Sequence, residues 1–250
     1  MTTETFPQET IELPSKGVFY PEDSPLRSGT IDLYLMTAKH EDILTSQNLI
    51  QQGVVLDRLI DALIATKGVK CTDLLIGDLN AVMIASRILG YGKDYEVSLE
   101  CPSCGSAAEQ TINLSTLETE NSPETTESRE FTVVLPLSKA EIVLQLLTRG
   151  DELAIDKELK ALKKINSNGG SESTSRLKAM IKSVNGDVLK GTIWAFVDSL
   201  LVKDARYLRE QYRTKAPDIN FNVSVNCSCG TEQKVRLPIG VNFFWPDARV

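Results

Sequence analysis

Two short cysteine motifs, far apart in the chain, constrain its fold more than any other feature. The first is Cys101-Pro-Ser-Cys104-Gly and the second is Cys227-Ser-Cys229-Gly. Each lies between two runs of alternating apolar and polar residues, which predicts a β-hairpin with thiols at its tip. Four thiolates from two such tips make a closed tetrahedral site that suits zinc and leaves no open position for catalysis. We therefore expect one structural Zn²⁺ ion with four ligands: Cys101, Cys104, Cys227 and Cys229.

Two alternatives to a shared metal site remain open. Each cysteine pair could be a separate redox centre, although that chemistry needs a lowered thiol pKa, typically at a helix N-terminus, and these thiols follow strands. The spacing could also be accidental, since the second motif is CxC rather than the more common CxxC. Cys71 stands in no such motif, and we expect it to be a small buried residue. Cysteines in metal-like spacing suit a reducing compartment better than a disulfide framework.

The chain also repeats a series of short blocks in the same order. The matched blocks are Leu74–Asp78 with Leu200–Asp204, and Ile31–Glu41 with Ile142–Glu152. The spacing from Asp78 to the first cysteine motif equals the spacing from Asp204 to the second, 23 residues in each case. Ordered matches of this kind argue for an internal duplication. We therefore expect an α+β fold of two duplicated halves, each made of short strands and inserted helices, joined by a zinc-ribbon-like four-cysteine site.

Composition and periodicity divide the chain into segments. The expected division is an extended N-terminal arm (1–29), a first repeat half with the first cysteine motif (30–114), an acidic linker (115–129), a second repeat half with the second motif (130–237) and an aromatic C-terminal tail (238–250). Helical periodicity is strongest over residues 42–52, 54–66, 78–89, 151–165, 175–184, 189–201 and 204–212, and strand alternation over 30–36, 130–137 and 142–147.

Large apolar side chains stand in both chain ends. They are Val18-Phe19-Tyr20 in the arm and Phe243-Phe244-Trp245 in the tail. Such groups either pack against the chain's own fold or anchor a partner protein, as clustered aromatic residues often do. We expect them to dock a partner, because the surrounding sequence is otherwise poor in secondary structure.

Charge and motif content exclude several classes of function. A net charge of −7 disfavours a protein that grips nucleic acid by its phosphates, and no segment approaches the roughly 20 apolar residues of a membrane span. Neither a GxxxxGK[ST] nor a GxGxxG phosphate-binding motif occurs. The single histidine, His40, has no nucleophile motif beside it, so we expect a solvated side chain among carboxylates and no enzyme activity.

Three stretches of the chain resemble a known family. The opening Leu13-Pro-Ser-Lys-Gly-Val-Phe-Tyr-Pro21 and the block from Ile31 to Leu44, together with Tyr95–Gly105, are similar to the T-even-type bacteriophage baseplate hub family. The resemblance implies a baseplate hub subunit or hub assembly chaperone that binds hub or tape-measure proteins. It also implies a place in the host cytoplasm during assembly, with the chain then either leaving or staying in the tail baseplate of the virion.

A second class of function remains open beside that resemblance. A zinc-ribbon adaptor for nucleic acid or transcription machinery would carry a basic face around the cysteine motifs. The charged residues that flank the motifs are mixed and net acidic: Lys93, Asp94, Glu96, Glu100, Glu109, Glu232 and Lys234. The sequence therefore favours a protein that binds other proteins, without nucleic acid or membrane as a partner.

Overall fold

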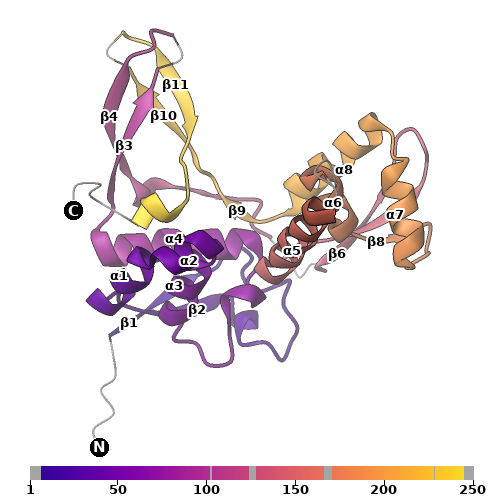
Figure 1. The fold of residues 1–250 in the computed structure, drawn as a ribbon, viewed down its shortest axis with the longest axis horizontal. Coiled ribbons are helices and arrows are strands. Elements are labelled where there is room, and N and C mark those ends of the chain that lie inside the picture. The colour runs from indigo at the N-terminus through magenta and orange to yellow at the C-terminus, as the bar shows by residue number, and fades with distance from the viewer. Residues whose placement is uncertain (1–6, 102, 124–127, 166–170, 228, 245–250) are drawn as a thin grey trace, which may run out of the picture.

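The computed structural model describes residues 7–101, 103–123, 128–165, 171–227 and 229–244. They form helices and small antiparallel sheets around two separate apolar cores, which confirms the α+β class. Figure 1 shows the two cores side by side, with a pair of β-hairpins rising from the first. We call this pair the cysteine tower; it consists of residues 94–113 and 222–236.

The first core lies between a strand pair and four helices. Strands β1 (Gln8–Glu12) and β2 (Thr30–Tyr34) pair antiparallel, and η1 (Pro25–Ser28) lies in the loop between them. The helices are α1 (Ala38–Thr45), α2 (Gln47–Gln52), α3 (Val55–Leu63) and α4 (Ile76–Tyr91), with η2 (Cys71–Asp73) before α4. Helix α3 buries one face through Val55, Leu59, Ile60 and Leu63, as its period of 3.6 predicts.

The helix expected over residues 42–52 is two helices. Ser46 ends α1 and begins α2 with φ −65° and ψ 101°, an extended conformation that interrupts the helical hydrogen bonds. Ser is neutral to unfavourable inside helices and favoured at their ends, which explains the break. The prediction of one continuous helix is therefore wrong at this position.

The second core lies between a three-stranded sheet and four helices. Strand β7 (Glu141–Gln145) is central, between β6 (Glu130–Val134) and β8 (Ile181–Val184). The helices are α5 (Arg149–Ile165), α6 (Glu172–Met180), α7 (Lys190–Asp198) and α8 (Val202–Lys215). The expected helix over 175–184 stops at Met180, because Ile181–Val184 pairs with β7 and buries Ile181 and Val184 in the second core.

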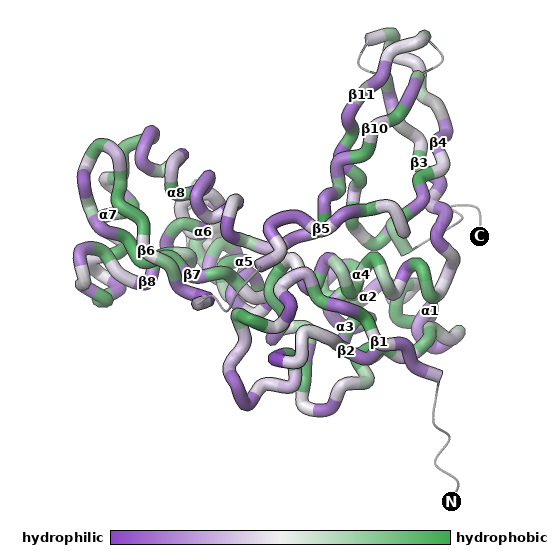
Figure 2. The backbone as a smooth tube through the Cα atoms, turned by 180° about the vertical axis from the view of Figure 1, so that it is seen from behind, coloured by the Kyte–Doolittle hydropathy of each residue, from purple (hydrophilic) through white to green (hydrophobic). Residues whose placement is uncertain are grey.

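The cysteine tower consists of two hairpins in separate two-stranded sheets. Strands β3 (Asp94–Glu100) and β4 (Ala107–Asn113) form one, and β10 (Asn222–Asn226) and β11 (Glu232–Arg236) form the other. Hydrophilic and hydrophobic residues alternate along β3 and β10 (Figure 2), as the sequence predicted. At the base, η3 (Leu114–Thr116) follows β4, and β5 (Thr119–Glu120) pairs with β9 (Asp218–Ile219), so part of the acidic linker adds to the fold.

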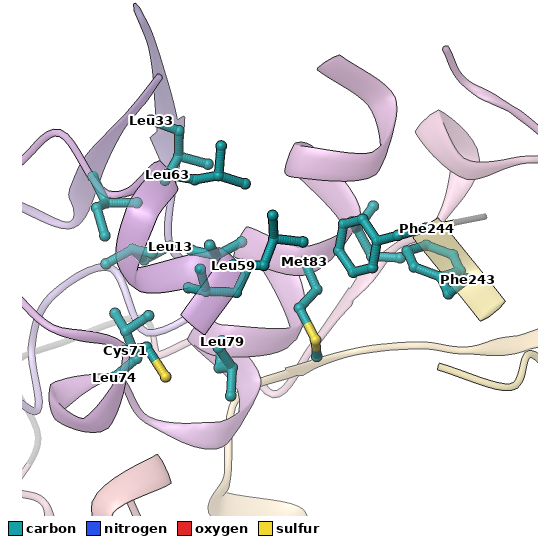
Figure 3. Packing of buried hydrophobic residues seen from close by; sticks show 14 of the residues in the cluster. Leu13, Leu33, Leu59, Leu63, Cys71, Leu74, Leu79, Met83, Phe243 and Phe244 are labelled. Atoms are coloured by element: carbon teal, nitrogen blue, oxygen red, sulfur yellow. The ribbon is translucent and has the colours of Figure 1, made fainter. Parts of the chain in front are cut away.

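The aromatic residues near both chain ends are part of the first core. Phe243 and Phe244 lie in η4 (Val241–Phe244) and are 1% and 0% exposed. Figure 3 shows both rings beside Met83 of α4. Phe19 and Tyr20 are likewise buried. The expectation that these side chains are free to dock a partner is therefore wrong, and Trp245, the third aromatic of the tail, lies outside the described residues.

A buried aspartate in the first turn of a helix fixes a loop in each half. Asp78 of α4 accepts hydrogen bonds from the Ser15 N–H at 2.9 Å and the Tyr20 hydroxyl at 2.6 Å. Asp204 of α8 accepts from the N–H groups of Leu137 and Ser138, both at 3.0 Å. As expected, each aspartate begins the helix that leads to its own cysteine motif.

The two hydrogen bonds to Asp204 predict an acid-sensitive second core. Burial acts to raise the pKa of Asp204, but the donated N–H groups hold it below its ordinary value. A carboxyl group whose pKa is lowered by folding stabilises the fold above its unfolded pKa of about 4, and this contribution is lost as the pH falls through the folded pKa. In Asp204→Asn we expect a lower unfolding temperature at pH 7 and a smaller decline between neutral and acid pH. Calorimetry at several pH values measures both, and an unchanged acid profile would contradict this role.

Candidate metal centre

Similar glycine-closed turns present the cysteines in both hairpins, and the first turn is one residue longer than the second. Cys101 follows β3 and donates its N–H to the Ser106 carbonyl at 2.9 Å, while Cys227 follows β10 and donates to the Thr231 carbonyl at 3.0 Å. Each turn closes through a glycine, Gly105 or Gly230, whose φ of +71° or +84° lies in the left-handed region that glycine tolerates without strain. The two tips therefore place their thiols in matching positions.

The structure brings all four predicted cysteines together. Their Sγ atoms all lie within 4.8 Å of one another. The shortest contacts cross between hairpins: Cys101 Sγ lies 3.9 Å from Cys229 Sγ, and Cys104 Sγ lies 3.7 Å from Cys227 Sγ. Among the described residues, no disulfide joins these thiols. A cluster of four converging thiols could hold a metal ion.

The surroundings of the thiols favour negative charge at two of them. The pKa of Cys227 is lowered to about 6, first by the N–H of Cys229 and then by its side chain. The Ser106 hydroxyl is the main cause of the lowered pKa of Cys104. The N–H of Cys104 also favours the thiolate of Cys101, but burial and the neighbouring thiols oppose it, and the net pKa rises to about 11. Close thiols cannot all ionise without a compensating positive charge.

Two hydroxyl residues that sequence reasoning missed lie against the thiols. Ser106 Oγ is 2.9 Å from Cys104 Sγ and 3.8 Å from Cys227 Sγ. Thr231 Oγ1 is 3.4 Å from Cys229 Sγ. The signal was present in the sequence, because each motif continues as Cys-Gly followed by Ser or Thr. Such neighbours orient thiolate ligands and stabilise their charge.

The remaining candidate residues lie outside this cluster. His40 caps α1, its Nδ1 accepting the Thr37 N–H at 2.9 Å, which is a structural role. Cys71 is fully buried, as expected, and its Sγ lies 3.5 Å from Asp57 Oδ1, while burial raises its pKa. Asp151, in the first turn of α5, accepts the Thr148 N–H at 2.9 Å.

Fold and site together define an α+β protein in which four cysteines cluster at the tips of two hairpins that are distant in sequence. Residues 9–245 match the family model described as T4 bacteriophage base plate protein, and the chain belongs to that family. A search of curated proteins and a search of solved structures find no match. The resemblance seen in the sequence is thus confirmed at the level of a T4-type baseplate protein.

Family membership carries a general functional setting. It supports a structural or assembly role in the phage baseplate, association with the virion tail and binding to other phage structural proteins, and it favours a non-enzymatic protein. Among the described residues, no helix combines the length and apolar character that crossing a membrane requires.

Proposed function

We propose that this chain is a non-catalytic assembly factor of the baseplate hub, acting as a chaperone or a minor hub subunit. It would bind hub or tape-measure proteins in the host cytoplasm and then leave or remain in the baseplate. Family membership and the resemblance of Leu13–Pro21 and Tyr95–Gly105 to hub proteins support this role. The alternative, a zinc-ribbon adaptor for nucleic acid or transcription machinery, lacks support from the net acidic residues around the cysteine motifs.

The observation that carries a protein-binding role is the distribution of exposed apolar side chains. Among the described residues, all the exposed large hydrophobic side chains except Ile50 belong to the half that surrounds the second core: Val134, Leu137, Val188, Leu189, Trp194, Leu201 and Val202. Concentrated apolar exposure of this kind marks interaction surfaces. The second half is therefore the part of the chain that contacts partners.

Zinc is the ion that we propose for the four cysteines. A tetrahedral site with Zn–S bonds of about 2.3 Å has sulfur–sulfur separations of about 3.8 Å. The two contacts between the hairpins, 3.7 and 3.9 Å, agree with that value. Four thiolates complete the shell, so the ion would be structural. It would fasten two hairpins that share no strand pairing among the described residues, and an isolated hairpin is marginally stable in water.

We also propose that the two halves arose by duplication. Leu13 donates its N–H to Gly29 across the first strand pair, and Leu135 donates to Ala140 across the second, each at 2.9 Å. A Ser-Lys pair follows each of these leucines, and the lysine of each pair has a positive φ, +49° at Lys16 and +58° at Lys139. The match of the Leu-Pro-Ser-Lys turn with Leu-Pro-Leu-Ser-Lys supports the repeat beyond the blocks identified from sequence.

Affinity capture from cells that produce the other tail proteins tests the proposed function. We expect the tagged chain to capture hub or tape-measure proteins, and Trp194→Ser to reduce that capture several-fold, as loss of an interface anchor does. Ile50→Ser is the matched control, because Ile50 and Trp194 are each 44% exposed and Ile50 lies on the first half. Capture of nucleic acid or RNA polymerase instead would favour the adaptor.

A further inference from the structure

The two halves meet at a junction formed by backbone as well as side chains. Leu75 forms an antiparallel bridge with Thr148. The Ile76 N–H donates to the Leu147 carbonyl at 3.3 Å, and the Arg149 N–H donates to the Leu74 carbonyl at 2.8 Å. Residues 74–77, at the start of α4, form a surface that we call the tail surface of the first half. It contacts residues 146–150, which follow β7 and which we call the head of the second half.

Two glycines permit the close approach at this junction. A Cβ atom at Gly77 would lie 1.8 Å from the Pro217 carbonyl oxygen, and one at Gly150 would lie 3.0 Å from the Thr72 carbonyl oxygen. The first distance is impossible for any other residue without displacing backbone, and the second is tight. The junction in its observed form therefore depends on glycine at position 77 and favours it at position 150.

The second half carries an equivalent tail surface that the described part of the chain leaves open to solvent. In the aligned blocks Leu201 and Val202 stand where Leu75 and Ile76 stand in the first half. Leu75 is 3% exposed, whereas Leu201 and Val202 are 53% and 81% exposed. Leu137 lies beside them, since its N–H binds Asp204 in the first turn of α8, and it is also exposed.

The first half carries an equivalent head, but with a lysine in the critical place. Thr37 and His40 repeat the capping contact of Thr148 and Asp151, and Lys39 occupies the position of Gly150. Lys203 likewise occupies the position of Gly77. Both lysines are exposed. A second copy of this chain, approaching as the halves approach each other, would therefore meet a Cβ atom at both contacts. Figure 1 shows α1, which follows the head of the first half, and α7, which precedes the tail surface of the second half, at opposite ends of the long axis.

We propose that the start of α8, together with Leu137, is a docking surface for an extended apolar segment of another baseplate component. The segment would resemble Leu146–Gly150, with a small residue in the place of Gly150. Lys139 and Lys203 are exposed at the edge of this surface, which favours acidic residues in the partner. A partner that supplies only a strand end lacks the contact made by Pro217, so the Cβ atom of Lys203 does not obstruct it. The inference rests on the duplication proposed above.

Sedimentation velocity on the full chain and its variants tests this surface. The wild-type chain should show no association that depends on Val202. In Lys39→Gly/Lys203→Gly, the head of the first half and the tail surface of the second half become complementary. We therefore expect the average mass to rise with concentration, because head-to-tail contacts between copies are heterologous and can continue from one copy to the next. Adding Val202→Asp to that variant should abolish the rise. Lys39→Ala/Lys203→Ala removes both charges but keeps both Cβ atoms, and it should behave as wild type.

Each contrary result overturns the proposal. A double-glycine variant that keeps the wild-type mass at all concentrations would show that the surface is not a junction site. Association that persists when Val202→Asp is added would show that the contact does not use this surface. Association of the alanine variant would show that the lysine charges, and not their Cβ atoms, keep the wild-type chain from associating. If the wild-type chain itself associated and Val202→Asp abolished that association, the surface would bind a second copy of this chain and not another baseplate component. Metal content and capture of tail proteins by Trp194→Ser are independent readouts, so failure here is distinguishable from failure of the proposed function.

Discussion

Replacing Cys227 with serine should abolish binding of the proposed zinc ion and separate the two hairpins of the cysteine tower. A structural zinc site in a small peptide contributes an apparent 10–16 kcal/mol at neutral pH, so loss of one thiolate removes a large part of the stability of the tower. The change should also reach the first core, because Val225 of the second hairpin and Leu237, which directly follows it, pack there. Elemental analysis of anaerobically purified protein and thermal unfolding measure the two effects, and a chelator should reproduce them in the wild type.

Cys71→Ser provides the matched control for this substitution. Cys71 is buried, it is the one cysteine of the sequence outside the cluster, and a serine hydroxyl can still donate to Asp57. We expect full metal content in this variant. One metal ion per chain retained in Cys227→Ser, or none in the wild type, would contradict a four-cysteine site.

Truncating Phe244 should unfold the first core at lower temperature. Its side chain is fully buried, and its ring lies 5.4 Å from that of Phe243, which in turn contacts Tyr95 at 5.1 Å. Removing a buried phenylalanine side chain typically costs about 3–5 kcal/mol through lost burial and the cavity left behind. Chemical denaturation of Phe244→Ala measures this loss.

Leu189→Ala is the control for the phenylalanine substitution. Leu189 is an exposed apolar residue of the second half, and surface substitutions usually change stability by less than about 0.5 kcal/mol. If Phe244→Ala were as stable as Leu189→Ala, the tail would be dispensable for the first core. Its aromatic residues would then be available to partners after all.

The parts of the fold that depend on local patterns could be predicted from the sequence. The apolar stripe of α3 and the hairpins around the cysteine motifs are local, and the structure contains both. The approach of Cys101 to Cys229 joins residues 128 positions apart, yet it was predictable, because a half-filled metal site at each tip needs the other. The need for four ligands in one site is the long-range constraint that made this contact predictable.

The misjudged elements are those whose environment comes from distant residues. Ile181–Val184 continues an amphipathic pattern from α6, and only pairing with β7 makes it a strand. Phe243 has no periodic context, and its place is set by the Arg87 Nε, which donates to its carbonyl at 3.0 Å across 156 positions. A short aromatic run therefore could not be assigned to core or surface without the fold, since tertiary contacts decide such cases.

The location of Phe243 and Phe244 has a consequence for synthesis on the ribosome. The first core begins at Leu13 but is complete only when residues 221–244 have joined it, whereas the sheet and helices of the second core lie wholly within residues 130–215. Domains commonly fold from the N-terminus as the nascent chain emerges, at about 5–20 residues per second. All residues of the sheet and helices of the second core are synthesised by residue 215, whereas the first core, although it begins earlier in the chain, stays incomplete until its last aromatic residues have been added.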